Sequence, residues 1–410
     1  MDLAYPKYII QKIYITSYKG DHFMINSIQM IRAIGIDVHK DSYSISAFNP
    51  QTTNFSAETT VAADSKSVIT YLKRLKKEIA TPVTIEIGYE AGPTGFGLKR
   101  DLEKAGYTCH VMAPTSIYRP AAGVKVKTDA KDARTLAKAV YWGSYSEVIP
   151  LFEEDESYRD YIRMRDDRKE ALKKAKQNLL SFLLRRDRKY SGNPWTQKHL
   201  SWLKKQEFES PIDKLTFQEY LNEVTRLNDA IVLLDAKIEE FSREDRYRDK
   251  VDKLRCFAGI DTHVAMVMIT EIGDYDRFTS AEAFSSYLGL CPGEHSSGKS
   301  TQKGGITKAG NSHCRKLLCE SANSIARTNP YKKSKRLLER QKGIAPDIIA
   351  YADRGSARIK SKYFNLLEYG KNANVAKAAC ARELSCFIWG MMTGHMESRG
   401  DIRETDQQVI

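Results

Sequence analysis

The chain has 410 residues, of which 65 are Lys or Arg and 52 are Asp or Glu, so its formal net charge is +13. This length predicts about two or three domains, and a composition with 41% hydrophobic and 29% charged residues is that of a globular protein. The composition excludes a disordered chain, a collagen and a disulfide-stapled miniprotein. The excess of positive charge favours a polyanionic partner, and nucleic acid is the first candidate.

The sequence contains no candidate for a membrane span or a signal peptide. The apolar stretch from Cys386 to Met392 is much shorter than the roughly 18 residues that a span requires. Lys7 and Lys12 interrupt the apolar residues at the start of the chain, where a signal peptide would have its core. The odd number of cysteines, seven, is typical of a reducing compartment. We therefore expect a cytoplasmic protein that binds no membrane.

Residues 31–152, which follow an extension over residues 1–30, are predicted to alternate between strands and helices. Short apolar or alternating runs predict strands over residues 33–38, 43–48, 83–87 and 107–112. Apolar residues at helical spacing, with Asp64 or Ser65 as one N-cap, predict helices over residues 65–79, 96–102 and 130–141. Two early strands joined by a turn, followed by alternating helices and strands, indicate a mixed α/β sheet.

Residues 153–252 are predicted to be almost entirely helical. In the second half, apolar residues recur at the 3-4 spacing of a coiled-coil seam, at Phe217, Tyr220, Val224, Leu227, Ile231, Leu234, Ile238 and Phe241. The preceding helix, over residues 159–189, is mostly charged and has a buried stripe of Leu172, Ala175, Leu179 and Phe182. Residues 191–194 break the chain between the two helices. We expect an antiparallel helical hairpin, which a second protomer could complete.

Residues 253–397 are predicted to form a compact, mainly helical domain with a Gly-rich insert over residues 293–310, and residues 398–410 a polar tail. From Ser296 to Cys319 there is no acidic residue, and the basic ones are Lys299, Lys303, Lys308, Arg315 and Lys316. Because glycines let the backbone approach a ligand closely, this segment suits phosphate groups. A serine here could act as a nucleophile if a base or a metal activates it, although serines in such loops commonly just form turns.

Four carboxylates in the first region stand at positions that suit metal binding. Asp37 lies in a strand that is otherwise apolar or small, so it needs a cation, a hydrogen-bond network or a metal. Glu90 follows another strand, and Asp129 and Asp132 share one face at the start of a helix. This order matches an RNase H-like arrangement, in which two divalent ions stabilise the attacking and leaving oxygens of a phosphodiester. Oxygen ligands and a phosphate substrate favour Mg²⁺.

These acids also have a plainer interpretation. Asp129 and Asp132 could simply complement the N-terminal end of a helix, where acidic residues are favourable. Glu86 competes with Glu90 for the second position, although it could be a surface residue of its strand. The four acids in this order, each at a strand or helix end, favour the metal site.

Basic residues near the acids and in the helical region are candidates for nucleic-acid contact. Residues 168–189 contain nine basic residues and two acidic ones, and Tyr190 and Trp195 lie close by for stacking on bases. We expect contacts from Lys125, Lys127, Arg168, Lys173, Lys176, Arg185, Arg186, Lys299, Lys303 and Lys308.

Two sets of motifs give the chain a resemblance to a known family. The first set is Gly35-Ile36-Asp37-Val38-His39-Lys40, Tyr89-Glu90-Ala91-Gly92-Pro93 and Val126-Lys127-Thr128-Asp129-Ala130-Lys131-Asp132-Ala133. The second set is Tyr287-Leu288-Gly289-Leu290-Cys291-Pro292 through Ser297-Gly298, and Ile306-Thr307-Lys308-Ala309-Gly310. In this order, over residues 31–393, the chain resembles the DEDD transposases of insertion-sequence family one-ten, the bridge-RNA-guided serine recombinases.

The resemblance implies a fold and a mechanism. It implies an RNase H-like (RuvC-like) mixed-sheet domain over 31–152, a coiled-coil helical hairpin over 153–252 and a mainly helical transposase domain over 253–397. Asp37, Glu90, Asp129 and Asp132 would bind Mg²⁺. Ser297, rather than Ser296, would attack the DNA phosphate and hold a covalent phosphoserine intermediate. The implied partners are the element's ends and target DNA, a structured guide RNA and further copies of the chain in a dimer or tetramer, near the nucleoid of a bacterium or archaeon.

Two other functions stay open beside this one. The first is a RuvC-like nuclease that hydrolyses DNA with activated water and forms no covalent adduct with the protein. The second is a non-catalytic nucleic-acid-binding scaffold whose acids merely cap helices. One turn departs from the family, because residues 257–261 replace the Pro-Gly-Ile-Gly that a helix-hairpin-helix-like motif often has there.

Overall fold

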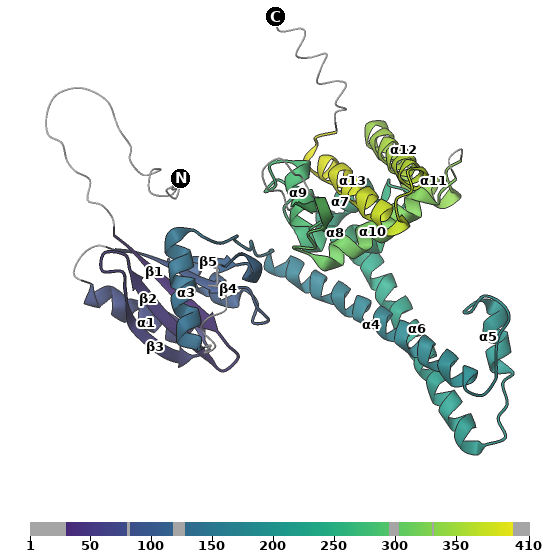
Figure 1. Ribbon diagram of the computed structural model, residues 1–410, viewed down its shortest axis with the longest axis horizontal. Helices are drawn as coiled ribbons and strands as arrows, with labels where there is room; N and C mark the ends of the chain where they lie inside the picture. Colours follow the sequence, from purple (N-terminus) through teal and green to yellow (C-terminus); the bar gives the residue numbers. More distant parts are fainter. Residues whose placement is uncertain (1–29, 80–82, 118–127, 295–302, 330–331, 397–410) are drawn as a thin grey trace, which may run out of the picture. The chain divides into compact units, whose positions relative to one another are not determined.

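Figure 1 shows the computed structural model of the protein, which describes residues 30–79, 83–117, 128–294, 303–329 and 332–396. The chain divides into two compact units, Met1–Pro150 and Leu151–Ile410. Over the described residues, no helix is both long enough and apolar enough to cross a membrane.

The first unit is built on a mixed sheet of five strands. In sheet order these are β3 (Asn54–Ala62), β2 (Ser42–Asn49), β1 (Met30–Val38), β4 (Val83–Glu90) and β5 (Thr108–Met112). The pairs β1–β2 and β2–β3 are antiparallel, whereas β1–β4 and β4–β5 are parallel. Helices α1 (Ser65–Glu78) and α2 (Gly97–Lys104) cover one face, and α3 (Asp129–Trp142) covers the other (Figure 1). A short 3-10 turn, η1 (Pro114–Ser116), follows β5. The expected mixed α/β, RNase H-like fold is confirmed.

The alternation of side chains along β1 explains the two covered faces. Ile34 and Ile36 are fully buried in the core that α1 and α2 complete. Ala33 belongs to the second core, against α3. Each buried aliphatic side chain of this kind contributes about 1.5–3 kcal/mol relative to an exposed one. Asp64 is the N-cap of α1, and its carboxylate accepts a hydrogen bond from the Ser67 amide at 2.8 Å.

Two strands of the sheet differ from the sequence prediction. β3 is absent from that prediction because it contains few large apolar residues, and its side chains alternate between exposed and half-buried, as at the edge of a sheet. β4 continues to Glu90, whereas the sequence prediction ends it at Gly88. Glu90 is therefore held by the strand itself and not by a loop after it.

The second unit contains a long antiparallel pair of helices, α4 (Glu153–Leu184) and α6 (Pro211–Phe241), with the short α5 (Gln197–Lys204) at one end of the pair (Figure 1). Ion pairs from Arg165 to Asp235 and from Arg186 to Asp213 show that the two helices run in opposite directions. Most of the predicted apolar stripe is buried in one cluster: Leu172, Ala175, Leu179, Phe182, Phe217, Val224, Leu227 and Ile231. α4 ends at Leu184, five residues before the predicted end at Lys189.

A helical bundle completes the second unit. Its helices are α7 (Asp245–Arg255), α8 (Thr262–Ile272), α9 (Ala281–Tyr287), α10 (Ser312–Ala326), α11 (Lys335–Gln341), α12 (Pro346–Glu368) and α13 (Ala373–Thr393). α8 lies at the centre, because every residue from Val264 to Ile272 is buried. The Gly-rich insert contributes a small antiparallel hairpin, β6 (Pro292–Glu294) and β7 (Lys303–Ile306).

Candidate active site

Acidic residues of the first unit gather where β1 ends and α3 begins. Asp37 is the second-last residue of β1, and Asp129 is the first residue of α3. The parallel register pairs Ile36 with Tyr89 of β4, so Glu90 comes level with Asp37. Because side chains at equivalent positions of neighbouring strands point to the same face, Asp37 and Glu90 both project to the face that α3 covers.

Two glycines allow α3 to approach the sheet closely. A Cβ atom added to Gly35 would lie 2.0 Å from the carbonyl oxygen of Ala133, and one added to Gly88 would lie 2.4 Å from Cγ2 of Val140. Only hydrogen therefore fits between these strands and the helix. The close contact fixes the first turn of α3, which carries Asp129 and Asp132, next to the end of β1.

His39 lies between two of these carboxylates. Its Nε2 atom is 3.1 Å from Oδ2 of Asp37 and 3.7 Å from Oδ1 of Asp129. One ligand atom from each of these three residues lies within 4.8 Å of the other two, close enough to share one ion. From the sequence alone, His39 has no assigned role. Its position two residues after Asp37 was the available signal, because alternate residues of a strand point to one face.

Burial raises the pKa of the Asp37 carboxyl, the nearby charges of Asp132 and Asp129 raise it further, and His39 opposes both effects. The carboxylates thus repel one another in a half-buried site, and a cation would relieve this repulsion. Carboxylate oxygens, with one imidazole nitrogen beside them, are ligands that divalent cations accept in proteins. The residues present therefore fit a divalent metal.

The other predicted acids have distinct places. Asp132 lies in the first turn of α3, near enough to Asp37 to raise its pKa, and both Asp132 and Glu90 make contacts within the protein. Glu86, the competitor of Glu90, is paired in register with Ala33, four residues before Asp37. Four residues of strand span about 13 Å, so Glu86 is remote from the acids around Asp37.

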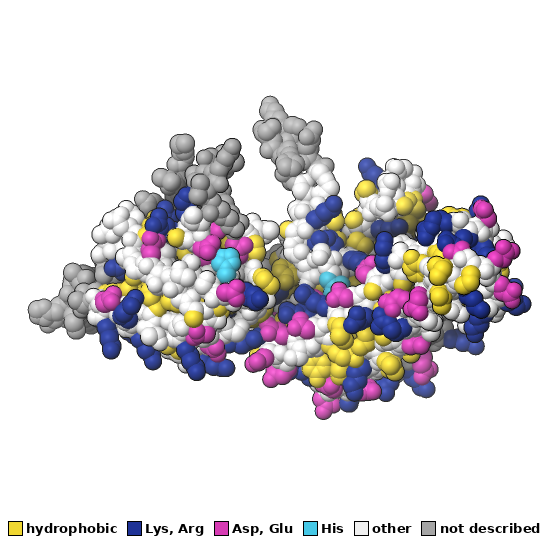
Figure 2. Space-filling view, turned by 90° about the horizontal axis from the view of Figure 1, so that it is seen from below, with side chains coloured by type: hydrophobic (Ala, Val, Ile, Leu, Met, Phe, Trp, Pro, Cys, Tyr) yellow, Lys and Arg dark blue, Asp and Glu magenta, His cyan; other side chains and the backbone are white. Residues whose placement is uncertain are grey.

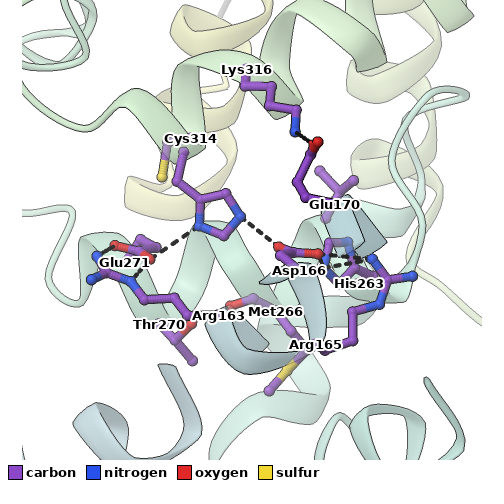
Figure 3. A network of polar contacts seen from close by, with 12 residues as sticks. Arg163, Arg165, Asp166, Glu170, His263, Met266, Thr270, Glu271, Cys314 and Lys316 are labelled. Atoms are coloured by element: carbon purple, nitrogen blue, oxygen red, sulfur yellow. Dashed lines mark hydrogen bonds and ion pairs between the residues drawn. The ribbon is translucent and has the colours of Figure 1, made fainter. Parts of the chain in front are cut away.

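A second polar cluster, which we call the histidine network, joins α4, α8 and α10 in the second unit (Figure 3). Glu271 of α8 has a side chain only 3% exposed, and it accepts two hydrogen bonds from Arg163, at 2.7 and 2.8 Å. Its carboxylate also lies 3.2 Å from Nδ1 of His313. The other ring nitrogen of His313 is 2.6 Å from Asp166, which in turn contacts His263 at 2.9 Å.

In the histidine network, each carboxylate is paired with positively charged or hydrogen-bonding side chains. Hydrogen bonds to Asp166 and then Glu271 raise the pKa of His313 to about 9, so its imidazole is protonated at neutral pH. Burial alone would raise the pKa of Glu271, but hydrogen bonds from His313 and Arg163 outweigh it and lower the pKa to about 2. Sequence reasoning missed this cluster because its members are far apart in the chain. Glu271 alone gave a signal, as a carboxylate within an apolar helix.

The histidine network adjoins the Gly-rich insert through α10. Asn311 is the N-cap of α10, and its side-chain amide donates a hydrogen bond to Glu271 at 2.7 Å. Its side-chain oxygen accepts hydrogen bonds from the backbone N–H groups of His313 and Cys314. Arg315 holds the two ends of the insert together, because it donates 2.9 Å hydrogen bonds to the carbonyls of Leu288 and Ala309. Ser296, Ser297 and Lys299 belong to residues 295–302, which lie outside the described residues.

The predicted nucleic-acid contacts that the structure describes differ in their surroundings. Arg168, Lys173, Arg185 and Lys308 are exposed. Lys176 is half-buried, with its ammonium 4.9 Å from the ring centre of Trp195, and Arg186 is already paired with Asp213. Lys303 begins β7. Lys125 and Lys127 lie outside the described residues.

Comparisons with known proteins match residues of both units to transposases. Residues 251–337 match a family described as the IS116/IS110/IS902 family of transposases, and residues 34–186 match a DEDD transposase family of the IS110 type. The chain is 36% identical to the putative transposase y4qE of Sinorhizobium fredii over 304 residues. The aligned region covers 74% of each of the two chains. It is 31% identical over 338 residues to the transposase for insertion sequence element IS1533 of Leptospira borgpetersenii, which covers 81% of this chain and 96% of that one.

Proposed function

The chain belongs to the IS116/IS110/IS902 family of insertion-sequence transposases, and on this premise we propose how it cuts and rejoins DNA. Ser297 is the nucleophile, Asp37, Glu90, Asp129 and Asp132 bind Mg²⁺, and a structured guide RNA selects the DNA. The observation that carries the proposal is the meeting of Asp37 and Asp129 around His39, with Asp132 close enough to raise the pKa of Asp37 and with Glu90 level with Asp37 in the sheet.

The acids supply the metal site. Asp37 and Glu90 approach it from the ends of two parallel strands, and Asp129 and Asp132 approach it from the first turn of α3. Mg²⁺ bound there would stabilise the attacking and leaving oxygens of a phosphodiester. The rigid sheet and the close packing at Gly35 hold the carboxylates in place before substrate arrives, so little reorganisation is needed during the reaction.

Ser297 supplies the covalent step. Its Oγ gives up its proton and forms a bond to phosphorus, the bond between phosphorus and a deoxyribose oxygen breaks, and that oxygen takes up a proton and leaves as a hydroxyl. The phosphoserine diester keeps one phosphoester bond to DNA, so a hydroxyl of a second strand can later displace the serine and rejoin the strands. Two observations support this step. Ser297 lies in a Gly-rich segment, and Arg315 donates hydrogen bonds to the carbonyls of Leu288, before the insert, and Ala309, near its end.

The proposal also includes guide RNA and oligomers. Exposed Arg168, Lys173 and Arg185 on and after α4 suit a phosphate backbone. The helical pair leaves large apolar side chains of α6 exposed, at Ile212, Leu215, Val232 and Leu233. A second copy of the chain could cover these side chains and so form a dimer, and two such dimers would form a tetramer.

The test is a comparison of Ser297→Ala with Ser296→Ala in a strand-cleavage assay on DNA that carries the element's end. We expect Ser297→Ala to abolish cleavage and to bind DNA normally, and Ser296→Ala to cleave. If Ser297→Ala recombines DNA as well as the original protein does, Ser297 is not the nucleophile and the serine mechanism is wrong. If Asp129→Asn is inactive while Ser297→Ala still cuts, the nuclease that uses activated water is the correct function. Mg²⁺ binding that Asp37→Asn leaves unchanged would favour a non-catalytic scaffold.

A further inference from the structure

A short segment around α11 contributes almost half of the chain's net charge. Residues 327–342 contain seven Lys or Arg and one Glu, a net charge of +6, whereas the whole chain has +13. On the face drawn in Figure 2, Lys and Arg side chains are interspersed with Asp and Glu and do not form one continuous basic area. The net charge of residues 327–342 therefore needs an explanation of its own.

Five cations of this segment, which we call the α11 basic surface, are exposed: Arg327, Lys332, Lys335, Arg336 and Lys342. None of the five forms an ion pair or a side-chain hydrogen bond with another described residue. A groove of about 700 Å³ is lined by three lysines and one acid, together with uncharged side chains: Lys333, Lys335, Lys342, Glu339, Leu338, Gln341 and Ile349. Clustered cations repel one another, so this arrangement costs stability unless an external anion is bound.

Neighbouring basic residues of the same segment have structural roles. Arg340 is half-buried and donates to the carbonyls of Ile260 and Ala258, at 2.6 and 3.2 Å, in the turn between α7 and α8. Lys333 pairs with Asp353 and with the side-chain oxygen of Gln341. The fold therefore uses the inward cations for its own stability and leaves the outward five unpaired.

The turn held by Arg340 is packed on one side against α10. A Cβ atom added to Gly259 would lie 2.3 Å from the carbonyl oxygen of Ser321, so the turn is packed against α10. In many helix-hairpin-helix motifs the backbone of this turn contacts phosphates, and here Gly259 of the turn faces α10. The exposed cations of the α11 basic surface belong to the same chain segment as Arg340, which holds this turn.

We propose that the α11 basic surface binds the phosphate backbone of double-stranded DNA. DNA is the partner that the transposase family establishes, and unpaired cations over an open groove recognise phosphates without regard to base sequence. This inference depends on family membership only, and it holds whether or not Ser297 is the nucleophile.

The experiment measures binding of the full chain to a fluorescein-labelled DNA duplex of random sequence by fluorescence anisotropy at several salt concentrations. All proteins carry Ser297→Ala and no divalent metal is added, so no cleavage takes place. The test variant replaces Lys332, Lys335, Arg336 and Lys342 with Gln. The control variant replaces four exposed lysines of the first unit with Gln: Lys73, Lys76, Lys77 and Lys104.

We expect the test variant to bind at least about tenfold more weakly and the slope of log affinity against log salt to fall by about 3–4, which is close to 0.9 for each lost phosphate contact. The control variant and a variant with Lys332, Lys335 and Lys342 replaced by Arg keep the original affinity. Equal loss in test and control variants overturns the proposal. So does a test variant that binds DNA normally but loses affinity for a labelled RNA hairpin. Because the four replaced side chains are exposed, we expect the test variant to keep the melting temperature of the original protein, which a thermal unfolding measurement checks.

Discussion

The acidic site of the first unit and the histidine network of the second are built from the same residue types but differ in charge balance. In the network, hydrogen bonds from His263, His313 and Arg165 lower the pKa of Asp166, and those from His313 and Arg163 lower the pKa of Glu271, in both cases against the effect of burial. In the acidic site, burial and neighbouring acids raise the pKa of Asp37 despite His39. A carboxylate cluster that holds enough cations stabilises the fold, whereas one that lacks them is ready to bind a metal.

The largest expected effect is on catalysis in the acidic site. Asp37→Asn removes one metal ligand, and we expect Mg²⁺-dependent strand cleavage to fall by about a thousandfold or more. The free energy of unfolding should stay the same or rise, because Asn removes a charge that burial penalises. Cleavage kinetics and thermal unfolding of the same protein check both statements. A variant that cuts normally, or that unfolds at a much lower temperature, would show that Asp37 has a structural role like that of Glu271.

The second effect is on stability in the histidine network. Glu271→Ala leaves Arg163 and His313 without their shared partner, and breaking a buried ion pair in this way costs about 3–5 kcal/mol. Glu170→Ala is the control, since Glu170 pairs with Lys316 where both side chains are more than half exposed. Removing such a surface pair costs less than about 1 kcal/mol. Chemical unfolding measures both values, and equal values would contradict the structural role of the network.

The third effect tests how the acidic site is positioned. Gly35→Ala places a methyl group against the backbone of α3, so we expect a loss of about 1–3 kcal/mol in stability and weaker metal binding. Gly97→Ala is matched to it, because an added Cβ at Gly97 meets nothing within 4 Å. Calorimetric titration with Mn²⁺ compares the two variants. Unchanged metal affinity in Gly35→Ala would show that the approach of α3 does not position the carboxylates.

The last effect, similar in size to the change in stability expected for Gly35→Ala, is the pH dependence of the histidine network. The pKa of His313 is about 9 in the folded protein and about 6.5 in an unfolded chain, so its stabilisation is complete below pH 6.5 and is lost as pH rises through 9. With a side chain 21% exposed, we expect a decrease of about 1–3 kcal/mol over this range. The facing carboxyls of Asp166 and Glu271 have lowered pKa values and titrate in acid, outside the range. Urea unfolding at several pH values should show the decrease in the original protein. If His313→Gln shows the same decrease, another group causes it.

The sequence predicted local features well and distant contacts poorly. The apolar stripes of α4 and α6 and the N-cap at Asp64 follow from spacing along a single element. β3 escaped prediction because an edge strand needs little apolar character, and its pairing to β2 supplies the missing stability. His39 became significant only when α3 brought Asp129 to it.

The histidine network shows why the rest could not be predicted. His313 lies 147 residues from Asp166 and 42 from Glu271, so no periodicity connects them. Only the packing of α4, α8 and α10 brings the three side chains together. Glu271 could be recognised as a buried charge in need of partners, but the sequence could not identify those partners.

The most direct test of the proposed mechanism is to trap and map a covalent protein–DNA adduct. The full chain is incubated with a labelled element-end substrate, with and without Mg²⁺, and the adduct is located by mass spectrometry. We predict an adduct on Ser297 that requires Mg²⁺ and is absent from Asp37→Asn. An adduct outside residues 296–300, or cleavage that proceeds with no adduct at all, would contradict the proposal.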